Sequence, residues 1–133
     1  MSCFMFPTVL QVSARLLLGE LSARLGKPAT FDDVDDEDIR YVASRGFDWV
    51  WMMGVWQTGD AGRNVSLNSK ELRSSYIKVL PDFTDADVCG SPFAIQEYTV
   101  HRDFGGDDAL ARLRELLFAE LPHGPTAELS AAA

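Results

Sequence analysis

Residues 46–59 read GFDWVWMMGVWQTG and hold all three tryptophans of the chain. Only Asp48 carries a charge here, and apolar side chains point to both faces of a strand formed by residues 47–53. A strand that is apolar on both faces is typical of a parallel sheet covered by helices on each side. We therefore expect a buried core strand, which ends shortly before Trp56.

The segments before this strand have the pattern of one strand followed by two helices. Residues 7–13 (PTVLQVS) are apolar and β-branched, which favours a buried strand. Residues 14–26 carry leucines at helical spacing and end on Gly-Lys-Pro, which predicts a helix and its stop. A capping pattern and a terminal Gly46 predict a second helix over residues 36–45. This order indicates an α/β fold with parallel strands.

The chain after the tryptophan-rich stretch is polar at first and then regains apolar patterning. Residues 58–91 form a long excursion, in which a helix is expected from Asn68 to Leu80. Loops of this length in a compact domain usually carry function. Residues 93–100 (FAIQEYTV) are another apolar, alternating segment within the same connection. Residues 107–119 place their leucines along one stripe, which predicts the last helix.

Charge and composition exclude several classes of function. The net charge is −8 and the twelve basic residues are scattered, which argues against nucleic-acid binding. No uncharged stretch approaches the roughly 20 residues that span a membrane, and the apolar N-terminus lacks the basic region of a signal peptide. Cys3 and Cys89 match no metal-binding spacing, so two buried or free thiols are favoured, with a disulfide left open. We expect a soluble, cytoplasmic protein.

The acidic stretch FDDVDDED (residues 31–38) is the most obvious candidate for a cation or acid site. Its spacing fits the start of a helix, where carboxylates cap free N–H groups and complement the helix dipole. The EF-hand pattern is absent from it. His101 and His123 are the only histidines, and neither belongs to a nucleophilic triad pattern. We therefore interpret the acidic stretch as a solvated helix start.

Three segments in this order resemble the opening of the α-amylase family, glycoside hydrolase family 13. They read PTVLQVSARLLLGELS (7–22), VASRGFDWVWMMGVWQTG (42–59) and GSPFAIQEYTVHRDFGGDDALARLRELL (90–117). The resemblance implies an α/β fold of the incomplete (β/α)8 (TIM) barrel type: the first two βα units, with a long loop after the second strand. It assigns residues 1–118 to this catalytic domain and leaves residues 119–133 as an irregular tail.

The resemblance also implies a substrate site at the carboxyl ends of the strands. Trp56 and Gln57 would emerge at this rim, and Phe93 stands where the family has an aromatic that stacks on a glucose unit. An aromatic ring can stack on the apolar face of a sugar, although for Trp56 packing under the following loop is the favoured interpretation. Ala94 replaces an aspartate of the family, which puts polar recognition there in doubt. His101 is equally a loop residue or a sugar ligand.

Retaining glycosidases need two carboxyl groups roughly 5–5.5 Å apart, and in the family these come from later strands that this sequence does not contain. We therefore expect a fragment of an α-amylase-family glycosidase that acts on α-glucosidic linkages and is itself inactive. Its parent would bind an α-glucan or maltooligosaccharide, and calcium would be a cofactor only of the full-length parent.

Two alternatives stay open beside the glycosidase fragment. One is a non-catalytic sugar-binding or interaction module that uses Trp56 and Phe93. The other is a small independent α/β enzyme, which no sequence motif supports. A partial set of strands also leaves sheet edges open, which predicts self-association.

Overall fold

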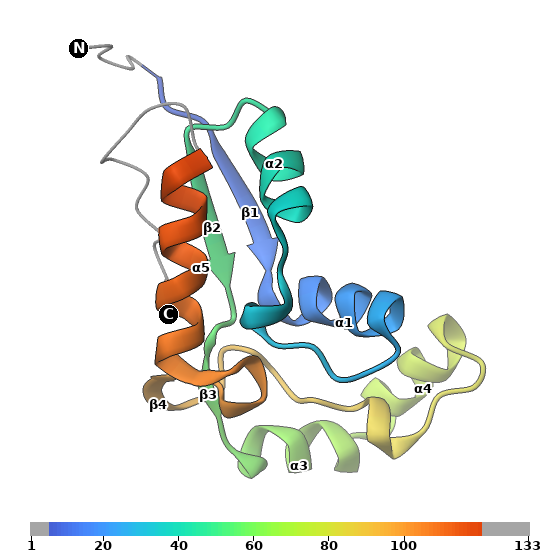
Figure 1. The fold of residues 1–133 in the computed structure, drawn as a ribbon. Coiled ribbons are helices and arrows are strands. Elements are labelled where there is room, and N and C mark those ends of the chain that lie inside the picture. The colour runs from blue at the N-terminus through green and yellow to red at the C-terminus, as the bar shows by residue number, and fades with distance from the viewer. Residues whose placement is uncertain (1–5, 121–133) are drawn as a thin grey trace.

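The computed structural model describes residues 6–120, and these form two separate sheets of two strands each. In the first sheet, β1 (Val9–Ser13) runs parallel to β2 (Trp49–Met53), with Val9 opposite Trp49. In the second sheet, β3 (Trp56–Thr58) runs antiparallel to β4 (Ile95–Val100). The fold is therefore a small α/β domain (Figure 1).

Five α-helices and three short 3-10 helices lie between or after the described strands. They are α1 (Ala14–Leu25), η1 (Phe31–Asp33), α2 (Asp36–Ser44), α3 (Asp60–Asn68), α4 (Lys70–Val79), η2 (Asp85–Asp87), η3 (Arg102–Phe104) and α5 (Gly106–Glu120). The segment containing α1, η1 and α2 is the crossover that parallel pairing of β1 and β2 requires.

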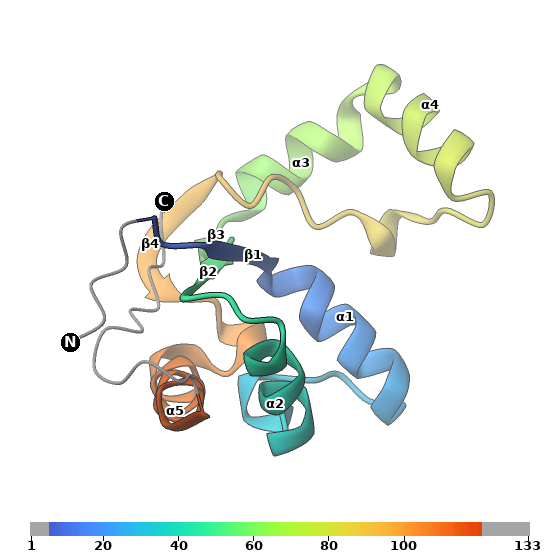
Figure 2. The same cartoon turned by 90° about the horizontal axis from the view of Figure 1, so that it is seen from above.

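The hydrophobic core lies on one face of the β1–β2 sheet. Val50 and Met52 point from β2 into a buried cluster with Leu113 of α5, Ile39 of α2 and Leu18 of α1. Figures 1 and 2 show α2 and α5 on the same side of the two strands. Burial of these aliphatic side chains contributes most of the favourable free energy of folding.

The opposite face of β2 is less well covered. Trp49, Trp51 and Met53 alternate with the buried residues and stay partly exposed. The indole N–H of Trp51 is itself buried and has no hydrogen-bond partner among the described residues. The prediction that helices cover both faces of this strand is therefore wrong, because the described helices that pack against the sheet lie on one side of it.

The prediction of an incomplete (β/α)8 barrel is also wrong. In residues 6–120, the strands do not continue one curved sheet, and the segment predicted as part of a long loop supplies β4 of a second, antiparallel sheet. The two sheets separate at Gly54, which has a φ of +74°. A backbone in this left-handed region turns the chain sharply, so β3 leaves the plane of β2 and pairs with β4 instead.

The helix starts agree well with the capping patterns of the sequence. The Asp35 side chain accepts hydrogen bonds from the N–H groups of Glu37 and Asp38, and Thr30 with Asp33 forms a second capping box. The interpretation of the acidic stretch as a helix start is thereby confirmed.

The excursion after β3 contains two helices rather than one. α3 was not predicted, and α4 begins after Ser69, whose hydroxyl accepts from the Leu72 N–H, instead of after Asn68. Figure 2 shows α3 and α4 standing apart from α1, α2 and α5. The first turn of α3 nevertheless packs closely against the segment before β4, because a Cβ added at Gly62 would lie 2.6 Å from the Ala94 Cβ.

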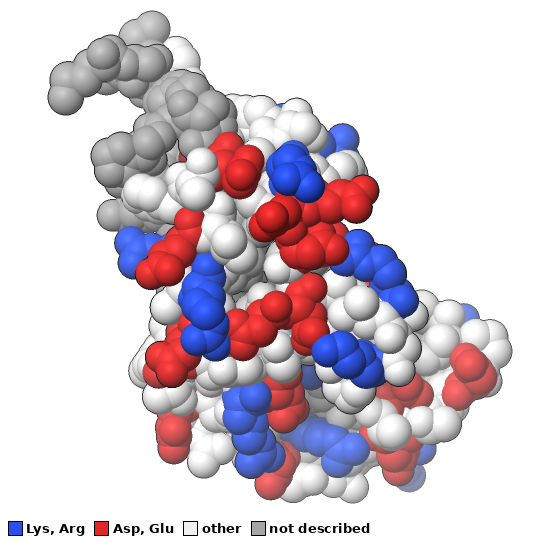
Figure 3. Space-filling model, viewed as in Figure 1, with Lys and Arg blue, Asp and Glu red and all other residues white. Residues whose placement is uncertain are grey.

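The last helix ends one residue beyond its predicted end at Ala119: α5 runs from Gly106 to Glu120, so its last two residues overlap the segment assigned to the irregular tail. Residues 121–133, including His123, lie outside the described residues, as does Cys3. None of the helices found in residues 6–120 combines the length and the apolar character needed to cross a bilayer. Acidic and basic side chains are interspersed over the face drawn in Figure 3.

Candidate functional site

A polar hollow of about 290 Å³ lies where the chain leaves β1, β3 and β4. We call it the Gln57 pocket. It is lined by Arg15, Gln57, Thr58, Gly59, Asp60, Arg63, Ala86, Val88, Cys89, His101, Arg102 and Asp103. The first turn of α1, directly after β1, contributes Arg15 to its lining.

Gln57 holds two walls of this pocket together. Its side-chain Oε1 accepts a hydrogen bond of 3.0 Å from the backbone N–H of Arg102, and its Nε2 donates to the Thr58 carbonyl over 2.9 Å. The first bond joins β3 to η3, which are 45 positions apart in the sequence. The amide is therefore a structural part of the pocket as well as a polar surface in it.

Arg63 fixes the opposite wall through backbone carbonyls. Its Nε donates to the Val88 carbonyl and its Nη2 to the Asp85 carbonyl, each over 2.8 Å. The Asp85 carboxylate pairs with Arg73 instead. Arg63 thus ties α3 to the returning chain around η2, and no side-chain carboxylate of the described residues pairs with its charge.

His101 forms the floor between these walls and is only 7% exposed. Its backbone N–H donates to the Val55 carbonyl over 2.8 Å, and its Nδ1 accepts from the Asp103 N–H over 3.2 Å. In the neutral ring this hydrogen bond leaves the proton on Nε2. Burial lowers the pKa of His101, and Arg15 lowers it further against the opposing charge of Asp103. The ring is therefore a neutral donor at physiological pH.

The Phe104 ring positions two side chains of the pocket lining, Arg15 and His101. The His101 ring lies 4.9 Å from it, and the Arg15 guanidinium lies over it at 5.1 Å from the ring centre. Phe31 contacts the same ring edge-on at 5.7 Å. A cation above an aromatic face is attracted by the ring quadrupole, so Arg15 keeps a fixed position without a carboxylate partner.

The structure brings together only part of the predicted site. Gln57 lines the pocket, whereas Trp56 packs on the core and meets Tyr98 edge-on at 5.8 Å between ring centres. The indole N–H of Trp56 is buried without a partner among the described residues. Phe93 lies in the turn before β4 and is 62% exposed, outside the pocket lining. The stacking roles of these two rings stay predictions.

Arg15 and Arg63 help to shape the pocket and were not predicted from the sequence. Arg15 follows the predicted first strand directly, and this position at the end of a strand was the available signal for it. Arg63 lies in the polar segment DAGRNV, and no local pattern distinguishes it from other exposed arginines. Its role depends on carbonyls 22 and 25 positions further along the chain.

The acidic stretch has partners that leave no free carboxylate cluster for a metal. Asp32 forms a bidentate pair with Arg112 at 2.6 and 2.9 Å, Asp33 pairs with Lys27, and Asp38 pairs with Arg24. These pairs lower the pKa values of the three carboxyls. In residues 6–120, no three His, Cys, Asp or Glu side chains gather in a way that could hold a metal ion.

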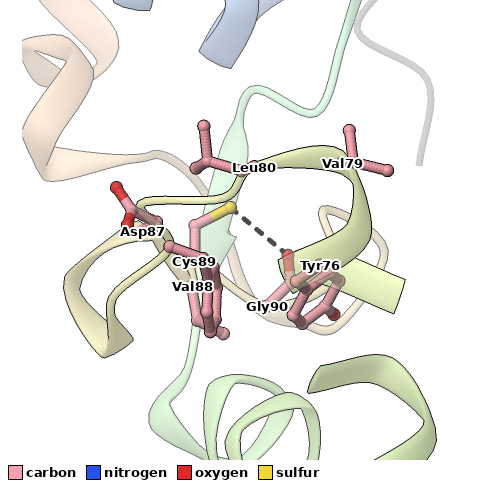
Figure 4. A pocket seen from close by; sticks show the side chains of 8 residues that line it. Tyr76, Val79, Leu80, Asp87, Val88, Cys89 and Gly90 are labelled. Carbon is pink, nitrogen blue, oxygen red and sulfur yellow. Dashed lines mark hydrogen bonds between the residues drawn. The ribbon is translucent and has the colours of Figure 1, made fainter. Parts of the chain in front are cut away.

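A second hollow, of about 350 Å³, lies between α4 and the chain after η2 (Figure 4). Most of its lining side chains are apolar, among them Tyr76, Leu80 and Val88. The Asp87 carboxylate at its wall is occupied by the N–H and hydroxyl of Thr84. This hollow therefore offers an apolar surface, and few of the donors and acceptors that sugar hydroxyls need.

No family model, characterised protein or solved structure matches this chain. The resemblance to the α-amylase family therefore rests on the three sequence segments alone. The residues of these segments and the geometry of the Gln57 pocket are the features that bear on function.

Proposed function

We propose that this chain is part of an α-amylase-family glycosidase acting on α-glucosidic linkages, and that it binds sugar in the Gln57 pocket without cleaving it. An α-glucan or maltooligosaccharide is the ligand of this proposal, and calcium remains a cofactor of the parent only. A cytoplasmic location is part of the same proposal, because the thiol of Cys89 is exposed and forms no disulfide within residues 6–120, which suits a reducing compartment.

One observation carries the proposal. Gln57, which the resemblance assigns to substrate binding, lines a polar hollow together with the nearly buried His101. Sugar hydroxyls both donate and accept hydrogen bonds, so they need amide, imidazole and guanidinium groups fixed in position. Gln57, His101 and Arg15 are each fixed by a contact with another part of the chain.

The test is a titration of the chain with maltotriose, followed through its backbone amide resonances. We expect shifts at Gln57, Arg102 and Asp103, because these amides surround the pocket, and no release of reducing sugar. Cellotriose, with β-linkages, is the matched control and is expected to bind more weakly. An absence of shifts at millimolar maltotriose would contradict the proposal.

A second candidate is the sugar-binding or interaction module that uses aromatic stacking. It is favoured by the exposure of Phe93, whose ring has most of its surface open to solvent. An exposed aromatic can cover the apolar face of a pyranose. The two candidates differ in one variant: Phe93→Ala abolishes binding in the stacking module and leaves binding in the Gln57 pocket nearly unchanged.

A further inference from the structure

The Gln57 pocket carries a positive surplus in a chain whose net charge is −8. Its lining holds three arginines and two aspartates, and His101 is neutral there. Arg102 and Asp103 lie 3.8 Å apart and largely compensate each other. The charges that remain belong to Arg15, Arg63 and Asp60.

Arg63 and Asp60 do not neutralise the pocket. Both guanidinium bonds of Arg63 go to backbone carbonyls, which are dipoles and cancel no net charge. Asp60 is exposed and begins α3, where a carboxylate complements the helix dipole. Its negative charge is therefore shared with the helix N-terminus and opposes only part of the two guanidinium charges.

Arg15 is the cation best placed to receive an anion. It is half-buried, fixed over Phe104, and has no carboxylate within ion-pair distance among the described residues. A planar guanidinium forms two parallel hydrogen bonds with a phosphate group. Because the Phe104 ring fixes its position, little conformational entropy is lost when it binds.

His101 supplies a second, independent donor to the same hollow. The ring is more than nine-tenths buried, its Nδ1 is occupied by the Asp103 N–H, and its Nε2 has no partner among the described residues. This Nε2–H is not one of the buried, unpartnered side-chain groups of the described residues, so it can reach a ligand in the hollow. A phosphoryl oxygen is a strong acceptor for this N–H.

From these contacts we infer that the Gln57 pocket binds a phosphorylated sugar, with Arg15 holding the phosphate and the His101 Nε2–H donating to it. This inference rests on the proposed function, since the sugar part of the ligand is taken from it. Gln57 and the rest of the pocket contact the hydroxyl groups. Asp60 also lines the pocket, and its negative charge weakens the attraction of the pocket for the phosphate.

The test compares three probes by isothermal titration calorimetry: α-D-glucose 1-phosphate, methyl α-D-glucopyranoside and inorganic phosphate. We expect glucose 1-phosphate to bind about tenfold more tightly than the other two, because one charge-assisted hydrogen bond changes a dissociation constant by about this factor. Arg15→Gln removes this preference. Asp60→Asn, at an exposed position, increases it.

The outcomes separate the inference from the proposed function. Equal affinity for both sugars overturns the inference and leaves sugar binding intact. Binding of inorganic phosphate as tight as that of glucose 1-phosphate overturns the sugar part, and no binding of any probe overturns both. Far-ultraviolet circular dichroism checks that Arg15→Gln is folded, and an unchanged preference in Asp60→Asn counts against the inference whatever that check shows.

Discussion

The side chain of Gln57 accepts a hydrogen bond of 3.0 Å from the backbone N–H of Arg102, and this single contact joins β3 to η3 across 45 positions. Both residues line the same polar hollow. A residue expected only to contact a ligand therefore also builds the wall on which the ligand would bind.

Replacing Gln57 tests this structural role. Gln57→Met keeps the size of the side chain and removes the acceptor, so we expect the free energy of unfolding to fall by about 1 kcal/mol. Gln57→Glu keeps an oxygen acceptor for the Arg102 N–H and should cost less. Urea unfolding followed by circular dichroism measures both. Equal losses in the two variants would show that the hydrogen bond adds nothing.

Gly54 is the position where the chain turns from one sheet to the other, and Gly54→Ala tests that turn. Its φ is +74°, and an added Cβ would lie 3.0 Å from the Pro92 Cβ. We expect a loss of about 1–2 kcal/mol from the backbone conformation alone, with a further loss from contact with Pro92. Gly46→Ala is the matched control, since its φ is +75° and nothing lies within 4 Å. Thermal unfolding gives the difference, and similar melting temperatures for the two variants would refute the crowding at Gly54.

The buried ring of His101 predicts a pH dependence of stability. Burial lowers its pKa from the ordinary value of 6.5, so the unfolded chain binds the proton more readily than the folded chain. The stability contributed by neutral His101 is complete above pH 6.5 and decreases as the pH falls towards the lowered pKa. Asp32, Asp33 and Asp38 lose their contributions only at more acidic pH, since their pKa values are lowered from 3.8.

His101→Asn isolates this effect. The asparagine side chain has an oxygen that can accept from the Asp103 N–H, but it does not titrate. We expect urea midpoints of the wild type to decrease between pH 7 and pH 5 more than those of the variant. Parallel curves for the two proteins would remove His101 as the cause.

The open edges and the less well covered face of the β1–β2 sheet predict self-association. Val9 lies at an edge of this sheet, opposite Trp49, and is 53% exposed. Val9→Lys places a charge on this edge and should shift the sedimentation profile towards the monomer. Val79→Lys, at a position of α4 that is 86% exposed, is the control. A wild-type chain that sediments as a monomer at all concentrations and unfolds reversibly would contradict the prediction.

The sequence predicts the regular elements with strong local signals. The leucine spacing of α1 and α5 and the capping residues Thr30 and Asp35 are local features, and the structure confirms them. The helix α3 has no such signal, because DAGRNVSLN combines a glycine with mostly polar side chains. Its position depends on the close approach of Gly62 to Ala94, which is a tertiary contact.

The sheet arrangement could not be predicted in the same way. β3 has three residues, and its pairing with β4 joins Thr58 to Ile95 across the whole excursion. Cross-strand pairing has no local sequence signature when the connection is long. The residues that line the pocket could not be predicted from local sequence either. Gln57 was predicted from a resemblance, whereas Arg15 and His101 come together through their contacts with Phe104.

The position of the three tryptophans determines what an emission spectrum of this chain can report. Trp49 and Trp51 lie in β2 and Trp56 lies in β3, whereas α4 and α5 contain no tryptophan. Fluorescence will therefore follow events around the two sheets, including occupancy of the Gln57 pocket next to Trp56 in the chain, and will report little on fraying of α4. Thermal unfolding followed by tryptophan emission and by circular dichroism need not give the same melting temperature for this molecule. The difference between the two melting temperatures would measure how independently α3 and α4 unfold.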